Sequence, residues 1–393
     1  RPTTKGKPIE FRDYQIDAFL YAINHERCLL LSPTASGKSF IIYLLLRYYQ
    51  QKFPNFKALI IVPTTSLVAQ MTSDFADYSK PDNWNASENV HQIYAGKDKI
   101  SSKPIYISTW QSLYKMNISY YADFDFILGD EAHLFKAKSL TSIMEKTINT
   151  KYKFGTTGTL DGTLTHKLVL EGLFGETHLV TTTNELIDKK TLSPFRIKSL
   201  VLQYPEEMRK QIKSYTYKEE IDVIISNEKR NKFIRNLAIS LNTNTLILFQ
   251  MVENHGKILY DLIKEKAKDG RKVFFVYGGT ETTDRENIRK AVENETNAIV
   301  VASYGTFSTG INITNLHNII FASPSKSRIR NLQSIGRSLR QNKSKKIATL
   351  YDIADDFSYK NYKNYTLNHF VERIKLYNEE QFEYTIITVP INS

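Results

Sequence analysis

Apolar positions in this chain fall into short uninterrupted runs that are separated by longer segments of mixed polarity. In the first half these runs cover residues 28–32, 58–62, 105–108 and 124–128. Runs this short and this rich in Leu and Ile are typical of strands that are buried on both faces. The segments between them have helical length, so the pattern predicts an α/β fold whose parallel sheet is covered by helices on both sides.

The same pattern returns after residue 240, where it predicts a second α/β unit. Its strands are expected at residues 245–250, 272–277, 298–302, 318–322 and 348–353, and its helices at 253–268, 282–294 and 327–340. No second phosphate-loop motif occurs in this half of the sequence. Functional side chains of both units are expected where their parallel strands end.

The segments outside these two units have a different pattern. Residues 195–203 resemble a strand, 206–228 a charged helical region and 366–382 a helix. We therefore expect four parts: a first domain over 1–180, a connector or docking segment over 181–235, a second domain over 236–356 and a helical tail over 357–393.

Length and composition agree with this division. A chain of 393 residues is too long for one ordinary core. Its 41% hydrophobic and 24% charged residues are those of a soluble globular protein, and no apolar run reaches the roughly 18 residues of a membrane span. No signal peptide is visible. Because the chain starts at Arg1 rather than Met, we expect a missing piece upstream.

The net charge of the chain indicates which partners it binds, and its cysteine content indicates the compartment in which it works. The single cysteine, Cys28, excludes a disulfide framework and a Cys-rich zinc site, and its apolar neighbours indicate a buried structural thiol in a reducing, cytoplasmic compartment. The net charge of +12 favours polyanionic partners, nucleic acid first. An AT-rich genome would also explain the many Lys, Asn and Ile residues.

Residues 32–39 form the most informative motif, Ser-Pro-Thr-Ala-Ser-Gly-Lys-Ser, between a predicted strand and a predicted helix. In this context Lys38 is expected to reach the β- and γ-phosphates of ATP, and Ser39 to hold Mg²⁺. Backbone N–H groups of the loop are expected to wrap the phosphates. The loop residues concerned are Pro33, Thr34, Ala35, Ser36 and Gly37. The usual first glycine is replaced by Ser32, and a chance Gly-Lys-Ser turn is the alternative.

Asp130 and Glu131 end another predicted buried strand, in the tetrad Asp-Glu-Ala-His. We expect Asp130 to bind Mg²⁺ and Glu131 to orient and deprotonate the attacking water. His133 is expected to link the nucleotide site to the second domain. For the tetrad alone, a simple helix start is the alternative.

Two further segments complete the candidate nucleotide site. Gln333, Arg337 and Arg340 fall near one face of a predicted helix, and the two arginines are suited to a γ-phosphate bound by the first unit. Gln15 carries an amide that can read an adenine edge, with Arg12 nearby. A solvated basic helix face and an ordinary first helix are the respective alternatives.

The order of these motifs, together with Thr157-Gly158-Thr159, resembles that of DEAH-box-type superfamily 2 helicases and translocases. The runs 301–313, 333–340 and 154–162 are most similar to the phage UvsW family of recombination and fork-remodelling helicases. The resemblance covers nearly the whole chain. It implies two RecA-like parallel-sheet domains in tandem, ATP and Mg²⁺ as cofactors, and a small N-terminal module upstream.

The resemblance also implies roles for individual residues. It assigns nucleic-acid contacts to Thr64, Thr65, Thr109, Trp110, Ser303 and Thr306, nucleotide contacts to Gly310 and Asn312, and coupling roles to Thr157 and Thr159. Trp110 fits a base-stacking role and a core position equally well. Asn312 replaces an Asp of many relatives, and Thr157-Gly158-Thr159 replaces the commoner Ser-Ala-Thr.

The resulting hypothesis is an ATP-dependent DNA helicase that unwinds or branch-migrates recombination, fork or R-loop intermediates, working as a monomer in the cytoplasm, or the bacterial host cytoplasm if phage-encoded. Its partners are branched or forked DNA or an RNA–DNA hybrid, with single-strand-binding or recombination proteins as candidates, and no membrane. The alternatives are an RNA helicase, a scaffold with an inactive ATP site and the motor subunit of a restriction endonuclease. The last needs a nuclease site, for which the tail offers Glu372, Lys375, Glu379, Glu380 and Glu383.

Overall fold

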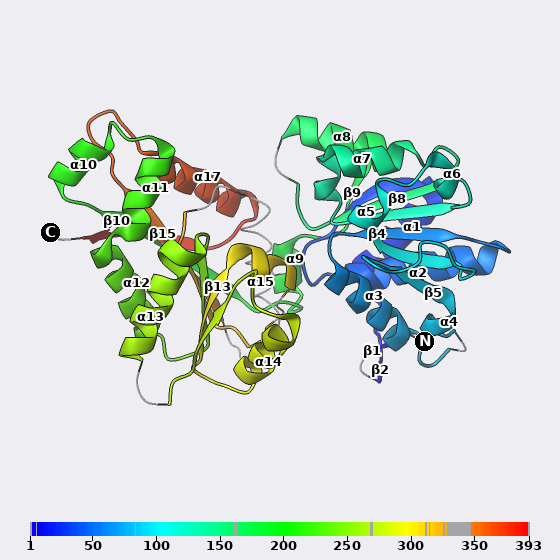
Figure 1. Cartoon of the computed structure of the whole chain (residues 1–393), viewed down its shortest axis with the longest axis horizontal. Coiled ribbons are helices and arrows are strands. Elements are labelled where there is room, and N and C mark those ends of the chain that lie inside the picture. Colours follow the sequence, from blue (N-terminus) through cyan, green and yellow to red (C-terminus); the bar gives the residue numbers. More distant parts are fainter. Residues whose placement is uncertain are drawn as a thin grey trace. The chain divides into compact units, whose positions relative to one another are not determined.

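The chain forms two compact units, residues 1–182 and 183–393, in a computed structural model (Figure 1). The structure describes residues 2–4, 6–82, 84–160, 163–267, 270–310, 313, 315–324, 327 and 347–391. Within these ranges, each unit holds a seven-stranded sheet whose strands all run parallel. The α/β prediction is therefore confirmed.

The first sheet has the strand order β5-β6-β4-β7-β8-β3-β9. In that order its strands are β5 (Val90–Ile93), β6 (Ile105–Thr109), β4 (Ala58–Val62), β7 (Phe126–Asp130), β8 (Tyr152–Thr157), β3 (Arg27–Leu31) and β9 (Thr177–Leu179). All five residues of β4 are buried, as expected for a central strand with helices on both faces. A small hairpin of β1 (Thr3–Thr4) and β2 (Lys7–Pro8) precedes the sheet.

Helices cover both faces of this sheet (Figure 1). They are α1 (Asp13–His25), α2 (Lys38–Lys52), α3 (Thr65–Tyr78), α4 (Ala86–Asn89), α5 (Trp110–Leu113), α6 (Ile118–Tyr121), α7 (Lys138–Glu145) and α8 (Leu164–Phe174), with the 3₁₀ helix η1 (Ala132–Lys136). Leu29 and Leu59 point to the face where Phe135 and Phe174 pack. Cys28 is fully buried in β3, as predicted, and burial raises the pKa of its thiol to about 12.

The second sheet has the order β12-β13-β11-β14-β15-β10-β16. In that order its strands are β12 (Val273–Val276), β13 (Ile299–Ser303), β11 (Thr245–Phe249), β14 (Asn318–Phe321), β15 (Ala348–Asp356), β10 (Phe195–Gln203) and β16 (Tyr384–Pro390). Its helices are α9 (Thr183–Asp188), α10 (Glu206–Ile212), α11 (Tyr217–Ser226), α12 (Glu228–Ser240), α13 (Lys257–Lys266), α14 (Thr282–Glu293), α15 (Tyr304–Gly310) and α17 (Tyr365–Glu379), with the π-helical turn η2 (Val252–Gly256). The expected helix over 327–340 lies outside the described residues, apart from Ser327.

The two sheets share one topology. When the strands of each unit are numbered one to seven along the chain, both sheets follow the order 3-4-2-5-6-1-7. The segment 181–235, expected as a connector that contains a strand at 195–203, and the tail 357–393, expected as helical, both contribute to this second sheet. They supply β10 and β16, and β10 pairs with β15 from Phe195 to Gln203. Their backbone hydrogen bonds are made to strands distant in the chain, so the local pattern could not show them as parts of a sheet.

Candidate nucleotide and nucleic-acid sites

The loop 32–39 leaves the end of β3 and enters α2, as predicted. Gly37 is the N-cap of α2, with a left-handed φ of +89°, and a Cβ there would collide with the amide nitrogen of Gln15. The left-handed backbone conformation favours glycine here, and a Cβ would push the Gln15 amide away from the loop. At the other end, the Ser32 backbone N–H donates to the Thr157 carbonyl over 2.8 Å, which fixes the loop to β8.

Ser32, where a glycine is usual, takes part in the structure of the loop. Its Oγ lies 2.6 Å from the Ser36 Oγ, and the Ser36 hydroxyl donates to the Pro33 carbonyl over 2.7 Å. A glycine could not make the first of these bonds. Ala35 adopts a left-handed φ of +69°, a conformation that costs an L-residue roughly 1–2 kcal/mol. The loop thus holds its curved shape with side-chain hydrogen bonds rather than with additional glycines.

Lys38 and Ser39 begin α2, so their side chains lie at the N-terminal end of a helix. The Lys38 Nζ donates to the Ser32 carbonyl over 3.1 Å and so turns back across the loop. The Ser39 hydroxyl lies 2.9 Å from the Tyr78 hydroxyl. Backbone N–H groups, a helix N-terminus and an ammonium group together are suited to a polyphosphate.

Asp130 and Glu131 follow the buried run of β7 and differ in their environments. The Asp130 carboxylate is buried and accepts a hydrogen bond from Thr156 Oγ1 at 2.8 Å. Burial, and next the Glu131 carboxylate, raise the pKa of Asp130, while the Lys38 ammonium opposes the shift. Glu131 has a left-handed φ of +52°, which marks a sharp turn directly after the strand. Among the described residues, no donor meets its Oε2 at hydrogen-bond geometry, although His133 Nδ1 lies 3.4 Å away.

A polar chain connects this turn to the end of β8. His133 Nδ1 lies 3.0 Å from Thr157 Oγ1, and the Thr157 hydroxyl donates to the Thr159 carbonyl over 2.9 Å. The residues expected to couple nucleotide chemistry to motion are therefore in direct contact within the first unit. His166 Nε2 lies 3.0 Å from the His133 carbonyl oxygen and adds a second contact to the turn.

Gln15 contacts the phosphate loop directly. Its amide nitrogen donates to the Ser36 carbonyl over 2.9 Å, and its Oε1 accepts from the Arg12 backbone N–H at 3.3 Å. Tyr14, which sequence reasoning missed, also donates to the Ser36 carbonyl, over 3.0 Å, and Arg12 donates to the Tyr14 hydroxyl over 2.7 Å. The start of α1 therefore holds the phosphate loop in place through hydrogen bonds to the Ser36 carbonyl. The Gln15 amide nitrogen is used for one of these bonds.

The donor set at this edge fits a divalent cation. A carboxylate from Asp130 and a hydroxyl from Ser39 are oxygen ligands of the kind that Mg²⁺ accepts beside substrate phosphates. Gly158 leaves space facing the loop, because a Cβ there would lie 3.5 Å from Lys38 Nζ and 3.6 Å from the Ser32 carbonyl oxygen. In the described part of the chain, this edge included, no group of three or more His, Cys, Asp or Glu side chains could by itself hold a metal ion.

A groove of about 560 Å³ lies at the ends of the neighbouring strands β4, β5 and β6, and we call it the Thr64 groove. Its walls include three predicted nucleic-acid residues, Thr64, Thr65 and Thr109. The Thr64 hydroxyl accepts from the Leu67 backbone N–H at 3.4 Å, which caps α3, and Thr109 Oγ1 lies 3.1 Å from Ser112 Oγ. Trp110 does not line this groove; it is partly buried and packs against the core.

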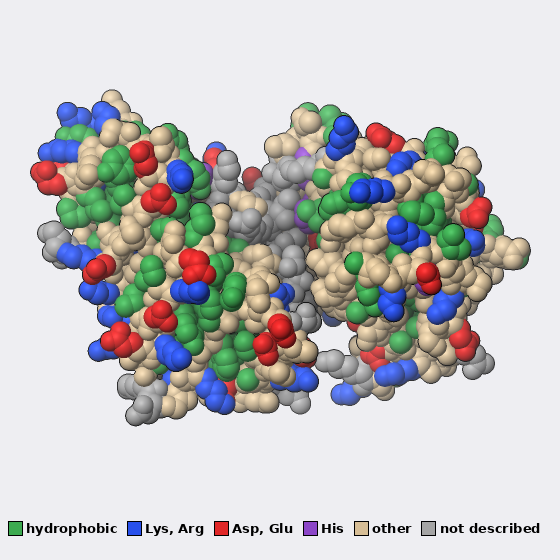
Figure 2. Space-filling model, viewed as in Figure 1, with side chains coloured by type: hydrophobic (Ala, Val, Ile, Leu, Met, Phe, Trp, Pro, Cys, Tyr) green, Lys and Arg blue, Asp and Glu red, His purple; other side chains and the backbone are tan. Residues whose placement is uncertain are grey.

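Three lysines that line this groove were not predicted from the sequence. Lys97, Lys99 and Lys115 line it together with Tyr94, and no acidic residue does so. The hydrophobic pattern did not reveal the neighbouring strand β5 (Val90–Ile93), because this short strand contains a His and a Gln and does not form an apolar run. The lysines that follow it could therefore not be placed at a strand end. Basic side chains predominate over acidic ones on the visible face of the first unit (Figure 2).

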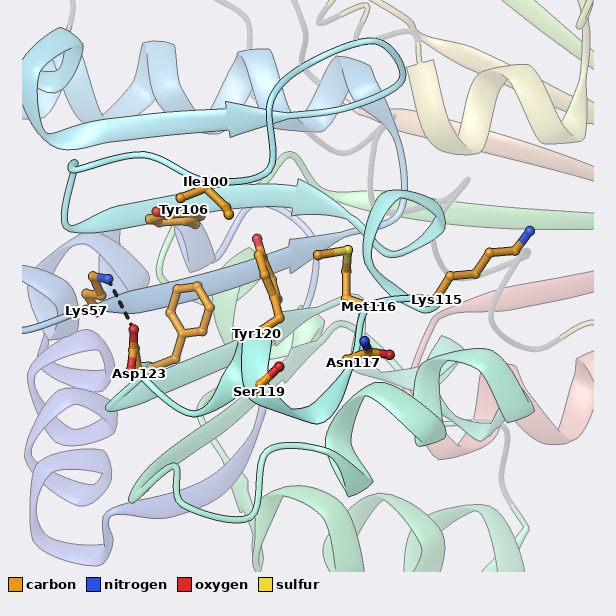
Figure 3. A pocket seen from close by; sticks show the side chains of 10 residues that line it. Lys57, Ile100, Tyr106, Lys115, Met116, Asn117, Ser119, Tyr120 and Asp123 are labelled. Carbon is orange, nitrogen blue, oxygen red and sulfur yellow. Dashed lines mark ion pairs between the residues drawn. The ribbon is translucent and has the colours of Figure 1, made fainter.

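A further hollow of about 460 Å³ lies near the same strands, and we call it the Tyr120 hollow (Figure 3). Half of the ten residues that line it are aromatic or apolar, among them Tyr106, Met116 and Tyr120. Lys57 and Asp123 form an ion pair of 3.7 Å at one end, and Lys115 points away from the other labelled side chains. This surface is therefore poorly suited to phosphates.

The second unit presents hydroxyls at the end of β13. Ser303 Oγ lies 2.8 Å from Thr306 Oγ1 and accepts from the Thr306 backbone N–H at 3.4 Å. Gly310 is the last residue of α15. Asn312, Gln333, Arg337 and Arg340 lie outside the described residues. No helix in the described part of the chain is both long and apolar enough to cross a bilayer.

Two family models match the chain. Residues 8–162 match the type III restriction enzyme res subunit, and residues 228–342 match the helicase conserved C-terminal domain. A protein of Enterobacteria phage T4, the ATP-dependent DNA helicase uvsW, is 38% identical over 401 residues, which cover 98% of this chain and 78% of that protein.

Solved structures are similar as well. The crystal structure of T4 UvsW is 37% identical, covers 100% of this chain and 79% of that chain, and has a TM-score of 0.45. The DNA-bound type ISP restriction-modification enzyme LlaBIII is 16% identical, covers 98% of this chain and 32% of that chain, and has a TM-score of 0.71. The latter likeness is one of fold alone and agrees with two RecA-like units in tandem.

Proposed function

This chain belongs to the UvsW family of ATP-dependent DNA helicases, and on that premise we propose that it couples ATP hydrolysis to movement along DNA and unwinds or branch-migrates recombination, fork or R-loop intermediates. The observation that carries the proposal is one edge of the first sheet. The phosphate loop, the Asp130–Glu131 turn and the Thr64 groove all lie where its parallel strands end. In parallel α/β sheets this is the edge at which ligands bind.

The hydrolysis step uses the residues of the loop and the turn. Backbone N–H groups of the loop and the Lys38 ammonium bind the β- and γ-phosphates, and Ser39 and Asp130 hold Mg²⁺. When bound there, Mg²⁺ would supply positive charge that stabilises the transferring γ-phosphoryl group. Glu131 orients the attacking water and accepts its proton. The Oε2 atom of Glu131, which meets no donor at hydrogen-bond geometry among the described residues, suits it to that role.

Further residues contact the nucleotide or couple its hydrolysis to motion of the protein. Gln15 and Arg12 contact the adenine side of ATP, and Gly310, Asn312 and Gln333 contribute from the second unit. Arg337 and Arg340 supply positive charge to the γ-phosphate, a role that rests on the motif at 333–340. Because His133 contacts Thr157, a change at the acidic turn on loss of the γ-phosphate is transmitted to the end of β8.

The DNA strand binds in the Thr64 groove and at the Ser303–Thr306 pair through its phosphates. Short hydroxyls, backbone N–H groups and lysines hold a backbone without reading bases, which suits a protein that moves along any sequence. Affinity should therefore fall steeply as salt is raised. Trp110 is partly buried and packs against the core cluster of the first unit, and its stacking on a base stays a prediction.

ATP turnover with and without DNA tests this function. We expect DNA to raise turnover several-fold, and Lys38→Ala to lower it at least about 100-fold because a phosphate-binding charge is lost. A panel of forks, four-way junctions, R-loops and RNA duplexes with ATP then identifies the substrate. Turnover that DNA does not raise, or that persists in Lys38→Ala, would refute the motor. Unwinding of RNA duplexes alone would refute the DNA assignment.

The motor subunit of a restriction endonuclease is the second candidate, favoured by the family model that matches residues 8–162. Such a subunit needs a nuclease site, and α17 supplies little toward one. Glu372 and Lys375 pair with each other over 2.7 Å on the exposed surface of that helix. Cleavage of the DNA substrates in the presence of Mg²⁺ would favour this candidate, and intact strands after complete ATP turnover would exclude it.

A further inference from the structure

A second groove continues the Thr64 groove around the edge strand β5. This Ser73 groove has a volume of about 660 Å³ and shares two wall residues with the Thr64 groove, Tyr94 and Lys97. Because the same two side chains line both, the grooves adjoin at the end of β5. A chain held in the first groove can pass over Tyr94 and Lys97 into the second.

The walls of the Ser73 groove are small and polar. Helix α3 contributes its exposed face, where Ala69, Ser73 and Ala76 recur at helical spacing and leave room beside the helix. The opposite wall contains His91 and Gln92 of β5. Hydroxyl, amide and imidazole groups without large apolar side chains favour a polar chain over an apolar peptide.

The charges of the two grooves have one predominant sign. Together they are lined by four lysines, Lys97, Lys99, Lys103 and Lys115, and by one acidic residue, Asp98. Lys103 is held in place, because its Nζ donates to the Ser87 carbonyl over 2.6 Å and to the Val90 carbonyl over 3.3 Å. These bonds to neutral carbonyls leave its positive charge uncompensated.

The other neighbouring surface does not offer this continuation. The Tyr120 hollow also shares a wall residue, Lys115, with the Thr64 groove. Its other lysine, Lys57, is paired with Asp123, and Lys115 points away from the hollow's other labelled side chains (Figure 3). The Tyr120 hollow also offers the Ser119 hydroxyl, but its lysine charges are paired or directed elsewhere, so the Ser73 groove is the more favourable continuation for a polyanion leaving the Thr64 groove.

We propose that the nucleic-acid strand bound in the Thr64 groove continues over Tyr94 and Lys97 into the Ser73 groove, which binds the sugar-phosphate backbone of additional nucleotides. The inference rests on the proposed function, because it extends the DNA site of the first unit. It assigns Tyr94 as a surface on which a base stacks at the junction. It also gives the first unit a longer footprint than the predicted motif residues alone provide.

The test compares two substitutions of the same kind on exposed serines of the same unit. Ser73→Glu places a negative charge in the Ser73 groove, and Ser119→Glu places one in the Tyr120 hollow. Affinity is measured by fluorescence anisotropy for labelled oligothymidylates of about 6 and about 16 nucleotides, a range that covers typical single-strand sites. The full chain is used, and circular dichroism confirms that both variants fold.

We expect Ser73→Glu to weaken binding of the long strand about fivefold, by repulsion of phosphates, and to change binding of the short strand by less than about twofold. Ser119→Glu should leave both affinities near those of the parent protein. An equal loss for short and long strands, no loss with Ser73→Glu, or a matching loss with Ser119→Glu would overturn the inference.

The parent protein separates this inference from the proposed function. If it binds the long strand more tightly than the short one, the extended footprint gains support. If both lengths bind equally, the extension is wrong while the DNA site of the Thr64 groove stands. Binding of neither length would instead refute the proposed function itself.

Discussion

The two units share one strand order, yet only one of them carries the phosphate-binding motifs. In the first unit, β3 ends in the phosphate loop and α2 begins at Lys38. In the second, the corresponding strand β10 is followed by Tyr204 and Pro205, and α10 begins at Glu206. The fold brings the strand ends together in both units, and the residues placed there decide whether phosphate can bind.

The second unit fills the corresponding edge with a buried ion pair. The Arg230 Nε donates to Asp355 over 2.7 Å, the Tyr204 hydroxyl donates to the same carboxylate over 2.7 Å, and Arg230 also donates to the Ala322 carbonyl over 2.8 Å. Arg230 and Asp355 are fully buried. Burial, and next the Asp355 carboxylate, raise the pKa of Tyr204 well above its usual range. In the second unit this network occupies the edge at which we propose that the first unit binds ATP.

Register identifies the counterparts of the acidic pair. Ile61 of β4 pairs with Gly129, and Leu248 of β11 pairs with Phe321 at the same position of the second sheet. Asp130 and Glu131 therefore correspond to Ala322 and Ser323. The Ser323 hydroxyl accepts from the Gln250 backbone N–H at 3.1 Å, a structural role where the first unit has the proposed base.

The hydroxyl pairs that we propose to hold the DNA strand, by contrast, occur in both units. Strand four of the first unit ends at Thr109, which contacts Ser112, and strand four of the second ends at Ser303, which contacts Thr306. In each pair the two residues are three positions apart in the chain. Their hydroxyl oxygens lie within hydrogen-bond distance of each other, at 3.1 Å and 2.8 Å. The shared topology thus repeats the hydroxyl pair proposed to hold a strand, while the residues proposed for hydrolysis occur at the strand ends of the first unit.

Breaking the buried pair should have the largest effect. Asp355→Asn leaves the Arg230 charge buried without its partner, so the free energy of unfolding should fall by about 3–5 kcal/mol. Urea unfolding measures this. The double variant Arg230→Met with Asp355→Leu should recover much of the loss, because it removes both charges. Equal stability of parent and Asp355→Asn proteins would mean that the network does not hold this edge closed.

Removing the proposed base should separate activity from stability. Glu131→Gln should lower ATP turnover by about 10²–10⁴-fold, since a general base contributes that much. Its stability should change by less than about 1 kcal/mol, because no donor among the described residues meets Glu131 Oε2 at hydrogen-bond geometry. Ser323→Ala is the matched control in the second unit, and its turnover should stay within about threefold. A similar loss in both variants would contradict the assignment of hydrolysis to one unit.

Acid should weaken the second unit through His255. Burial, and next the Arg230 charge, lower the pKa of His255 from 6.5 to about 3. The unfolded chain therefore takes up a proton below about pH 6.5 while the native chain does not, so stability falls as the pH falls toward 3. Between pH 7 and pH 5 the loss from this group is about 2 kcal/mol. Unfolding of the parent and of His255→Gln across this range isolates it, and the variant should show the shallower pH dependence.

The hydroxyl pairs should give the smallest effect and the closest test of the shared topology. Thr109→Val and Ser303→Ala each remove one hydroxyl, worth about 0.5–1.5 kcal/mol, so each should weaken DNA affinity roughly two- to tenfold. The two losses should be similar in size when measured by salt-controlled titration. A loss in one variant only would show that the units do not hold the strand in the same way.

Most of the central architecture follows from local patterns. The prediction for β4 (Ala58–Val62) agrees to the residue, because five consecutive buried side chains leave a clear apolar run. Strands β5 and β16 were missed for the opposite reason, since β5 is short and mixed and β16 is an exposed edge strand with few buried residues. The expected helix over 206–228 divides into α10, α11 and the start of α12, where Thr216 and Asn227 cap new helices.

The amino-acid sequence by itself determined the parts of this protein that depend on neighbours in the chain. These are the strand–loop–helix around Lys38, the acidic turn at Asp130 and the repetition of an α/β pattern. Tertiary structure alone decided that β10 and β16 complete the second sheet, that Gln15 holds the phosphate loop, and that lysines beyond β5 line a groove with Thr64. The physical reason is distance along the chain: parallel pairing, buried ion pairs and grooves join residues whose local sequence contains no trace of one another.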